Sequence, residues 1–247
     1  MSYIIKTRDD FLLDGVSALA YGLAVEMPQP VPMARQRYTS FQSGDSDITT
    51  PDDSYEAVRY TLTARRIKTP DTFRASDLYA ALASAKTLTL TRNAGRVYRI
   101  ASVVDVTPTA RIKGNEITYR ITFNLQPFAY HADNPIVTPE NSSITNPGTR
   151  YSRPIYYIQQ AQTGGGSLIT NASISVNGQT LAVAFPPSSG GRQTIVVDAE
   201  RMIAYNNADG TNWTRYTSGL FPFLSPGSNA IAATDCTVTL RGNWRDY

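Results

Sequence analysis

Apolar and polar residues alternate over long stretches in the first half of the chain. Residues 58–64 and residues 117–125 alternate for a full strand length, and residues 96–106 add a third stretch rich in β-branched side chains. Because successive side chains of a strand point to opposite faces, a period of two predicts half-buried β-strands. Gly114-Asn115 predicts the turn between two of them.

One segment has helical spacing instead. Leu78, Ala81 and Leu82 recur on one face of a helix, and Ser76 or Asp77 is suited to cap its N-terminus. The pattern predicts a β-sandwich with a single helix packed on it.

A proline-rich, polar segment precedes the first long strand. It runs from about residue 27 to residue 53 and is too polar for a core. We expect an arm or long hairpin that contacts a neighbouring subunit. The expected contact residues are Pro28, Pro30, Pro32, Met33, Arg35 and Tyr38.

The second half has shorter strands joined by polar turns. Asn177-Gly178, between residues 174–176 and 181–183, is a strong hairpin signal. Further strands are expected at residues 194–198, 201–205 and 236–244. This spacing predicts an antiparallel sandwich.

Charge and proline content place a domain boundary between the halves. Residues 139–247 contain no lysine, and residues 131–139 are proline-containing, which favours an extended connection. The expected domains are 1–134 and 139–247.

Composition narrows the function classes. The 247 residues are 41% hydrophobic and 17% charged, with a net charge of +3, which is typical of a globular protein and gives little reason to expect nucleic-acid binding. The N-terminus lacks the pattern of a signal peptide, and no run of about 20 apolar residues predicts a membrane span.

Candidate catalytic groups are few. His131 is the only histidine, so a two-histidine metal site is excluded. Asp198 and Glu200 form either a glycosidase pair or, far more commonly, a turn. Residues 206–212 resemble a calcium loop only faintly, and Cys236 fits a small core residue. No cofactor and no metal is expected, and the chain is not expected to be an enzyme.

Aromatic residues near the C-terminus are the best argument for sugar binding, although core packing is the more common role. They are Trp213, Tyr216, Phe221, Phe223, Trp244 and Tyr247.

The order of motifs resembles the distal tail (Dit) proteins of siphophages. The motifs are Asp14-Gly15, Tyr21-Gly22, residues 123–130, residues 144–149, residues 153–158, Val176-Asn177-Gly178, residues 195–202, residues 219–229 and residues 243–247. The short acidic segment at residues 43–47 departs from the glycine-rich arm of many members.

The resemblance implies a mainly β protein with an N-terminal ring-forming β-sandwich and a C-terminal galectin-like β-sandwich. It also implies a homohexameric ring at the virion tail tip, with the tail tube protein, a tail-associated fibre or lysin protein and receptor-binding proteins as partners. Two alternatives stay open: a carbohydrate-binding module for host glycans, and a glycan depolymerase.

Overall fold

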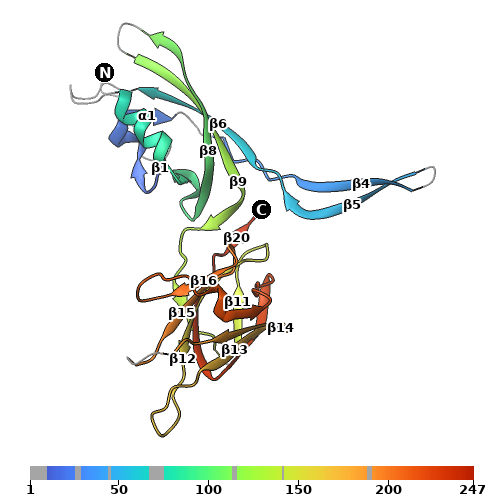
Figure 1. Cartoon of the computed structure of the whole chain (residues 1–247). Helices are drawn as coiled ribbons and strands as arrows, with labels where there is room; N and C mark the ends of the chain where they lie inside the picture. Colours follow the sequence, from blue (N-terminus) through green and yellow to red (C-terminus); the bar gives the residue numbers. More distant parts are fainter. Residues whose placement is uncertain are drawn as a thin grey trace. The chain divides into compact units, whose positions relative to one another are not determined.

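The computed structural model describes residues 10–25, 29–43, 46–66, 75–112, 116–140, 142–187 and 191–247. The chain divides into two compact units, residues 1–132 together with Tyr247, and residues 133–246. Both are built almost wholly of antiparallel strands (Figure 1). The mainly β fold predicted from the alternating pattern is confirmed.

Unit 1 is organised around one sheet in the order β2-β1-β7-β8-β9-β6-β3. Its elements are β1 (Phe11–Leu13), β2 (Val16–Ser17), η2 (Ala18–Tyr21), β3 (Leu23–Val25), β4 (Gln36–Ser43), β5 (Ser46–Tyr55), β6 (Val58–Arg66), α1 (Ala75–Ser84), β7 (Thr87–Leu90), η3 (Thr91–Asn93), β8 (Arg96–Ile112) and β9 (Glu116–His131). The three strands predicted by alternation are β6, β8 and β9, which lie side by side in the sheet. The turn predicted at Gly114-Asn115 lies outside the described residues.

The core of unit 1 forms on the inner face of this sheet. In β6, alternate residues from Val58 to Ala64 are buried, as the period of two requires. Leu78 and Leu82 of α1 cover the same core. The helix begins at Ala75, so Ser76 and Asp77 lie within its first turn and the capping prediction for them was wrong.

Unit 2 contains two five-stranded sheets, in the orders β10-β19-β12-β15-β16 and β11-β18-β13-β14-β17. Its elements are β10 (Ile136–Val137), β11 (Ser143–Asn146), β12 (Ile155–Gln160), β13 (Asn171–Val176), β14 (Gln179–Ala184), β15 (Thr194–Asp198), β16 (Ile203–Asn206), η4 (Thr214–Tyr216), β17 (Thr217–Gly219), β18 (Gly227–Thr234), β19 (Cys236–Arg241) and β20 (Arg245–Asp246). One apolar cluster joins the inner faces of both sheets, with Tyr156 of β12 and Ile174 of β13 fully buried in it. This is the arrangement of a β-sandwich.

Three details of unit 2 differ from the sequence expectation. The strand expected at residues 236–244 ends at Arg241 as β19. Ile136 and Val137, predicted to lie in an extended connection, pair with β19 as strand β10. Arg201 and Met202, predicted to be in a strand, form a turn, in which Met202 has a φ of 55°. The strand therefore starts at Ile203.

The hairpin predicted from Asn177-Gly178 is confirmed. Strands β13 and β14 pair from Asn171–Ala184 up to Val176–Gln179. Asn177 and Gly178 have φ angles of 49° and 84°, and two successive positive values are those of the type I′ turn that suits the strand twist.

Candidate assembly surface

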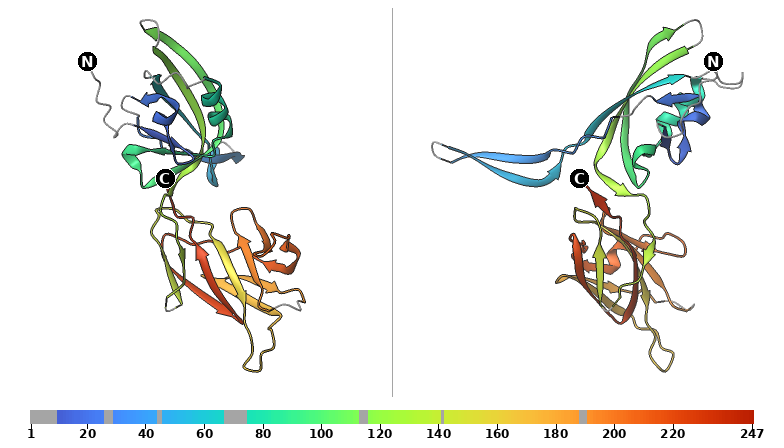
Figure 2. Two further views of the ribbon diagram at one scale, coloured as in Figure 1. Left: turned by 90° about the vertical axis from the view of Figure 1, so that its left-hand side faces the viewer. Right: turned by 180° about the vertical axis from the view of Figure 1, so that it is seen from behind.

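One distinct feature of unit 1 is the arm, which comprises residues 29–35 followed by the β4–β5 hairpin. The two strands form a sheet of their own, and no third strand of the described chain pairs with either. Figures 1 and 2 show this ribbon standing apart from the other strands of unit 1. A two-stranded ribbon by itself is at best marginally stable in water.

The expected contact residues follow this arm. Pro30, Pro32 and Arg35 are exposed, Met33 is 70% exposed, and Tyr38 on β4 is 60% exposed. Pro28 lies outside the described residues. Met33 and Tyr38 are thus available for contact with another protein, although single exposed apolar side chains are common on protein surfaces.

The base of the arm is fixed to the core of unit 1. Ala34 is buried, and the Tyr60 hydroxyl donates a 2.8 Å hydrogen bond to the Gln29 carbonyl. Burial raises the pKa of Tyr60 to about 12, so this hydroxyl keeps its proton at neutral pH. Tyr55, at the end of β5, packs edge-on against Phe128 at 5.1 Å. The arm therefore leaves the domain from a defined position.

The register of the arm is regular along most of its length. Thr39 pairs with Thr50 and Ser43 with Ser46, and the pairing shifts between Gln36 and Tyr38. Such a bulge bends and twists a ribbon locally. The chain thus presents a bent ribbon of two strands to its surroundings.

Strand β8 offers a second surface of unit 1 that sequence reasoning did not identify. Strand β7 pairs only with residues 97–99 of β8, while β9 pairs along its whole length. The side of β8 beyond Ser102 therefore has no neighbouring strand in the described chain, and Val104 is 48% exposed. Pro108 and several register shifts interrupt this edge, which limits uncontrolled strand pairing.

The side chain of Asp198, a candidate catalytic carboxylate, stabilises a turn. Its Oδ1 accepts hydrogen bonds from the backbone N–H groups of Glu200 and Arg201 at 3.0 and 3.1 Å. This geometry matches the turn alternative rather than a pair of carboxylates facing a cleft.

The loop at residues 206–212 also uses its oxygens internally. Oδ1 of Asn206 accepts from Ala208 N, and Oδ1 of Asp209 accepts from Thr211 N. The hydrogen bond from Thr211 also lowers the pKa of Asp209. Within the described residues no group of three metal-ligating side chains occurs.

The remaining candidate groups occupy structural positions. His131 is the last residue of β9, opposite Arg96, rather than a linker residue. Cys236 is half-buried and packs against the core of unit 2, as its alternation with Val238 predicted. Burial raises the pKa of the Cys236 thiol to about 11. No helix of the described chain is long and apolar enough to span a membrane.

The aromatic residues divide into two groups. Trp213 and Trp244 are buried in the core of unit 2 and are unavailable for stacking on a sugar. Tyr216 and Phe221 are partly buried against the same core, Phe223 is 38% exposed and Tyr247 is 47% exposed. Core packing, the more common role, is therefore confirmed for both tryptophans.

The fold of the two units can be compared with that of known proteins. No protein-family model and no curated protein matches the chain. Among solved structures, the chain is similar to SPP1 Dit (gp 19.1), described as a paradigm of the hub adsorption apparatus in phages that infect Gram-positive bacteria. The TM-score is 0.66 at 14% sequence identity, and the match covers 94% of this chain and 96% of that chain. The chain has the Dit fold. The Dit resemblance seen in the order of motifs is thus confirmed at the level of the fold, over both units.

Proposed function

We propose that the protein is a structural subunit of a phage tail tip, a Dit-like hub protein that self-associates into a ring. The observation that carries the proposal is the match to the Dit fold over nearly the whole of both chains. Fold alone does not specify function. The proposal therefore also rests on surfaces of this chain that suit assembly.

The arm provides the strongest independent support. Its two strands pair with no third strand of the described chain, and Met33 and Tyr38 are exposed. Contact with another protein would bury these two side chains and supply the packing partner that an isolated two-stranded ribbon needs. We infer that the protein contacted by the arm is a second copy of the same chain, in the neighbouring subunit.

Such a contact is heterologous, because the arm of one copy meets a different surface of the next. A heterologous contact gives a closed ring when its rotation closes, and an open filament when it does not. In the proposed ring, six copies close around an axis. The hub would connect the tail tube protein to the fibre, lysin or baseplate proteins, and unit 2, expected to be galectin-like, would provide a peripheral attachment point for receptor-binding proteins.

The arm can be shortened without disturbing its base. Thr39 and Thr50 are directly paired, so an Asn-Gly turn can replace residues 40–49 and leave the Tyr55 contact intact. In native mass spectrometry we expect the unmodified protein at six times the mass of the 27.1 kDa chain. The shortened variant should be mainly monomeric because it lacks most of the inferred contact.

A second shortened loop provides the control. Gly164 and Gly165 are at an exposed loop tip in unit 2, and deleting both changes chain length without touching the arm. This control should keep the mass of the unmodified assembly. Rings of unchanged mass in the arm variant would disprove the role of the arm, whereas a monomeric unmodified protein would disprove self-association.

A further inference from the structure

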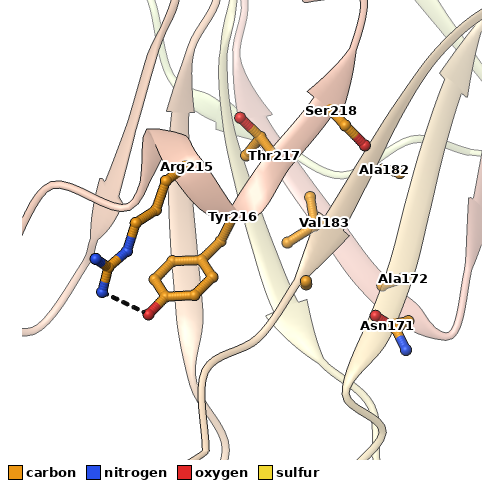
Figure 3. A pocket seen from close by; sticks show the side chains of 9 residues that line it. Asn171, Ala172, Ala182, Val183, Arg215, Tyr216, Thr217 and Ser218 are labelled. Atoms are coloured by element: carbon orange, nitrogen blue, oxygen red, sulfur yellow. Dashed lines mark hydrogen bonds between the residues drawn. The ribbon is translucent and has the colours of Figure 1, made fainter.

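Unit 2 contains a small surface pocket of about 230 Å³ at one end of the β14–β17 pair. Figure 3 shows its lining side chains, which come from β13, β14, β17 and the short helix η4. They are Asn171, Ala172, Ala182, Val183, Ala184, Arg215, Tyr216, Thr217 and Ser218.

The pocket exists because a strand ends early and its neighbours are small. Strand β17 pairs with β14 only from Leu181–Gly219 to Val183–Thr217. The residues just before Thr217 form the helix η4 and do not pair with β14, while β14 continues to Ala184. Alanine at positions 172, 182 and 184 leaves the space unfilled.

Tyr216 forms one wall and is held in place from two sides. Trp213, itself in the core, packs edge-on against its ring at a centroid distance of 6.1 Å. The Arg215 guanidinium lies 4.8 Å from the ring centroid, and its Nη2 donates a 2.8 Å hydrogen bond to the Tyr216 hydroxyl. The ring is therefore already fixed in the unliganded protein, which reduces the entropy lost on binding.

Of the nine lining residues, one is charged, four are neutral and polar, and four are apolar, namely Ala172, Ala182, Val183 and Ala184. Asn171 offers its amide and Ser218 its hydroxyl, whereas the Thr217 hydroxyl already donates to the Thr214 carbonyl at 2.8 Å and can only accept a further bond. A phosphate or other compact anion would need several cationic groups, whereas only one of the nine lining residues is charged. An aromatic ring beside neutral donors and acceptors suits a ligand with an apolar face and a rim of hydroxyls.

We propose that this pocket binds a single pyranose unit of a saccharide, with its C–H face on Tyr216 and its hydroxyls toward Asn171 and Arg215. Sites for drug-sized ligands measure about 300–1,000 Å³, so the observed 230 Å³ suits a ligand of one ring. The pocket lies wholly within unit 2. The inference thus does not depend on ring assembly.

Saturation-transfer NMR with the full-length protein tests the proposal. The probes are glucose, galactose, N-acetylglucosamine and glucuronate, each at a concentration on the order of 10 mM, because contacts with one sugar unit give weak affinity. We expect saturation transfer to at least one of the four. No transfer to any of them would overturn the proposal.

A bulky side chain that fills the pocket tests the proposal most directly. Ala182 is exposed on β14, so Ala182→Phe occupies the pocket without removing a core contact. Binding should weaken by about tenfold or more. Ser218→Phe, on the residue paired with Ala182, fills the same space from β17 and replaces Ala182→Phe if that variant does not fold.

Phe223→Ala is the matched control, because Phe223 is an exposed aromatic of unit 2 that does not line the pocket. It should bind the sugar as the unmodified protein does. If a folded pocket-filling variant binds as tightly as the control, the sugar occupies another surface and the proposal is wrong.

Discussion

Asn229 is a buried polar residue that connects three segments of unit 2. Its side chain is fully buried. Oδ1 accepts hydrogen bonds from Ser225 N and from Asn177 Nδ2, and Nδ2 donates to the carbonyls of Ser225 and Gly227, all at 2.8 Å. The amide thus joins the β13–β14 turn to the loop that leads into β18, and Nδ2 also donates a longer bond of 3.5 Å to the Ile144 carbonyl of β11.

Replacing Asn229 with alanine should destabilise unit 2 strongly. Each of the four short bonds contributes a net ~0.5–1.5 kcal/mol. The partner groups belong to half-buried Ser225 and to exposed Asn177 and Gly227, which regain part of this energy by binding water. Since the four share one side chain and do not add fully, we expect a loss of about 3 kcal/mol in the free energy of unfolding. For a unit of this size that corresponds to about 12 °C in Tm.

Tryptophan fluorescence during urea unfolding measures this change selectively. Both tryptophans of the chain, Trp213 and Trp244, lie in the core of unit 2. Their signal therefore reports the unfolding of that unit. Extrapolating the unfolding free energy to zero urea at a fixed protein concentration gives the difference between the variants.

Asn212→Ala provides the comparison. Asn212 is exposed, and its Oδ1 accepts one hydrogen bond, from Thr214 N at 2.9 Å, so its removal should cost about 1 kcal/mol or less. Equal losses in the two alanine variants would refute the argument that burial and the number of bonds set the cost.

Two further predictions concern single residues. Because burial raises the pKa of Cys236 to about 11, its thiol remains protonated at pH 8, and a thiol-reactive dye should label the folded chain far more slowly than the urea-unfolded chain; equal rates would contradict this. Gly219 has a φ of 101°, and a Cβ there would collide with the Thr180 carbonyl oxygen, so Gly219→Ala should lower the unfolding free energy by about 2 kcal/mol or more. Gly165→Ala, with open space around the new Cβ, should change it by less than about 0.5 kcal/mol in the same urea titration.

Patterns within the sequence predicted the elements whose stability is mostly local. Strand β6 buries one face from Val58 to Ala64, so its alternation is unbroken, whereas in β9 the alternation covers only residues 117–125. The Asn177-Gly178 turn follows from backbone preferences alone. Proline and polar content also predicted the arm, with a long hairpin as one of its two expected forms.

Elements that depend on distant partners were beyond sequence reasoning. Strands β1, β3 and β7 have only three or four residues, too few for a periodic pattern to be recognised. Ile136 and Val137 form a strand only because β19 lies beside them. Trp213 and Tyr216 have similar sequence surroundings, and tertiary packing alone decides that one is buried while the other lines a pocket.

Negative-stain electron microscopy of the purified full-length protein tests the proposed function most directly. If exposed arms join successive copies, the particles will be closed rings of uniform size, and class averages will show six-fold symmetry. A field of single 27.1 kDa particles at micromolar concentration would contradict the account, since the arm would then have no second copy to contact.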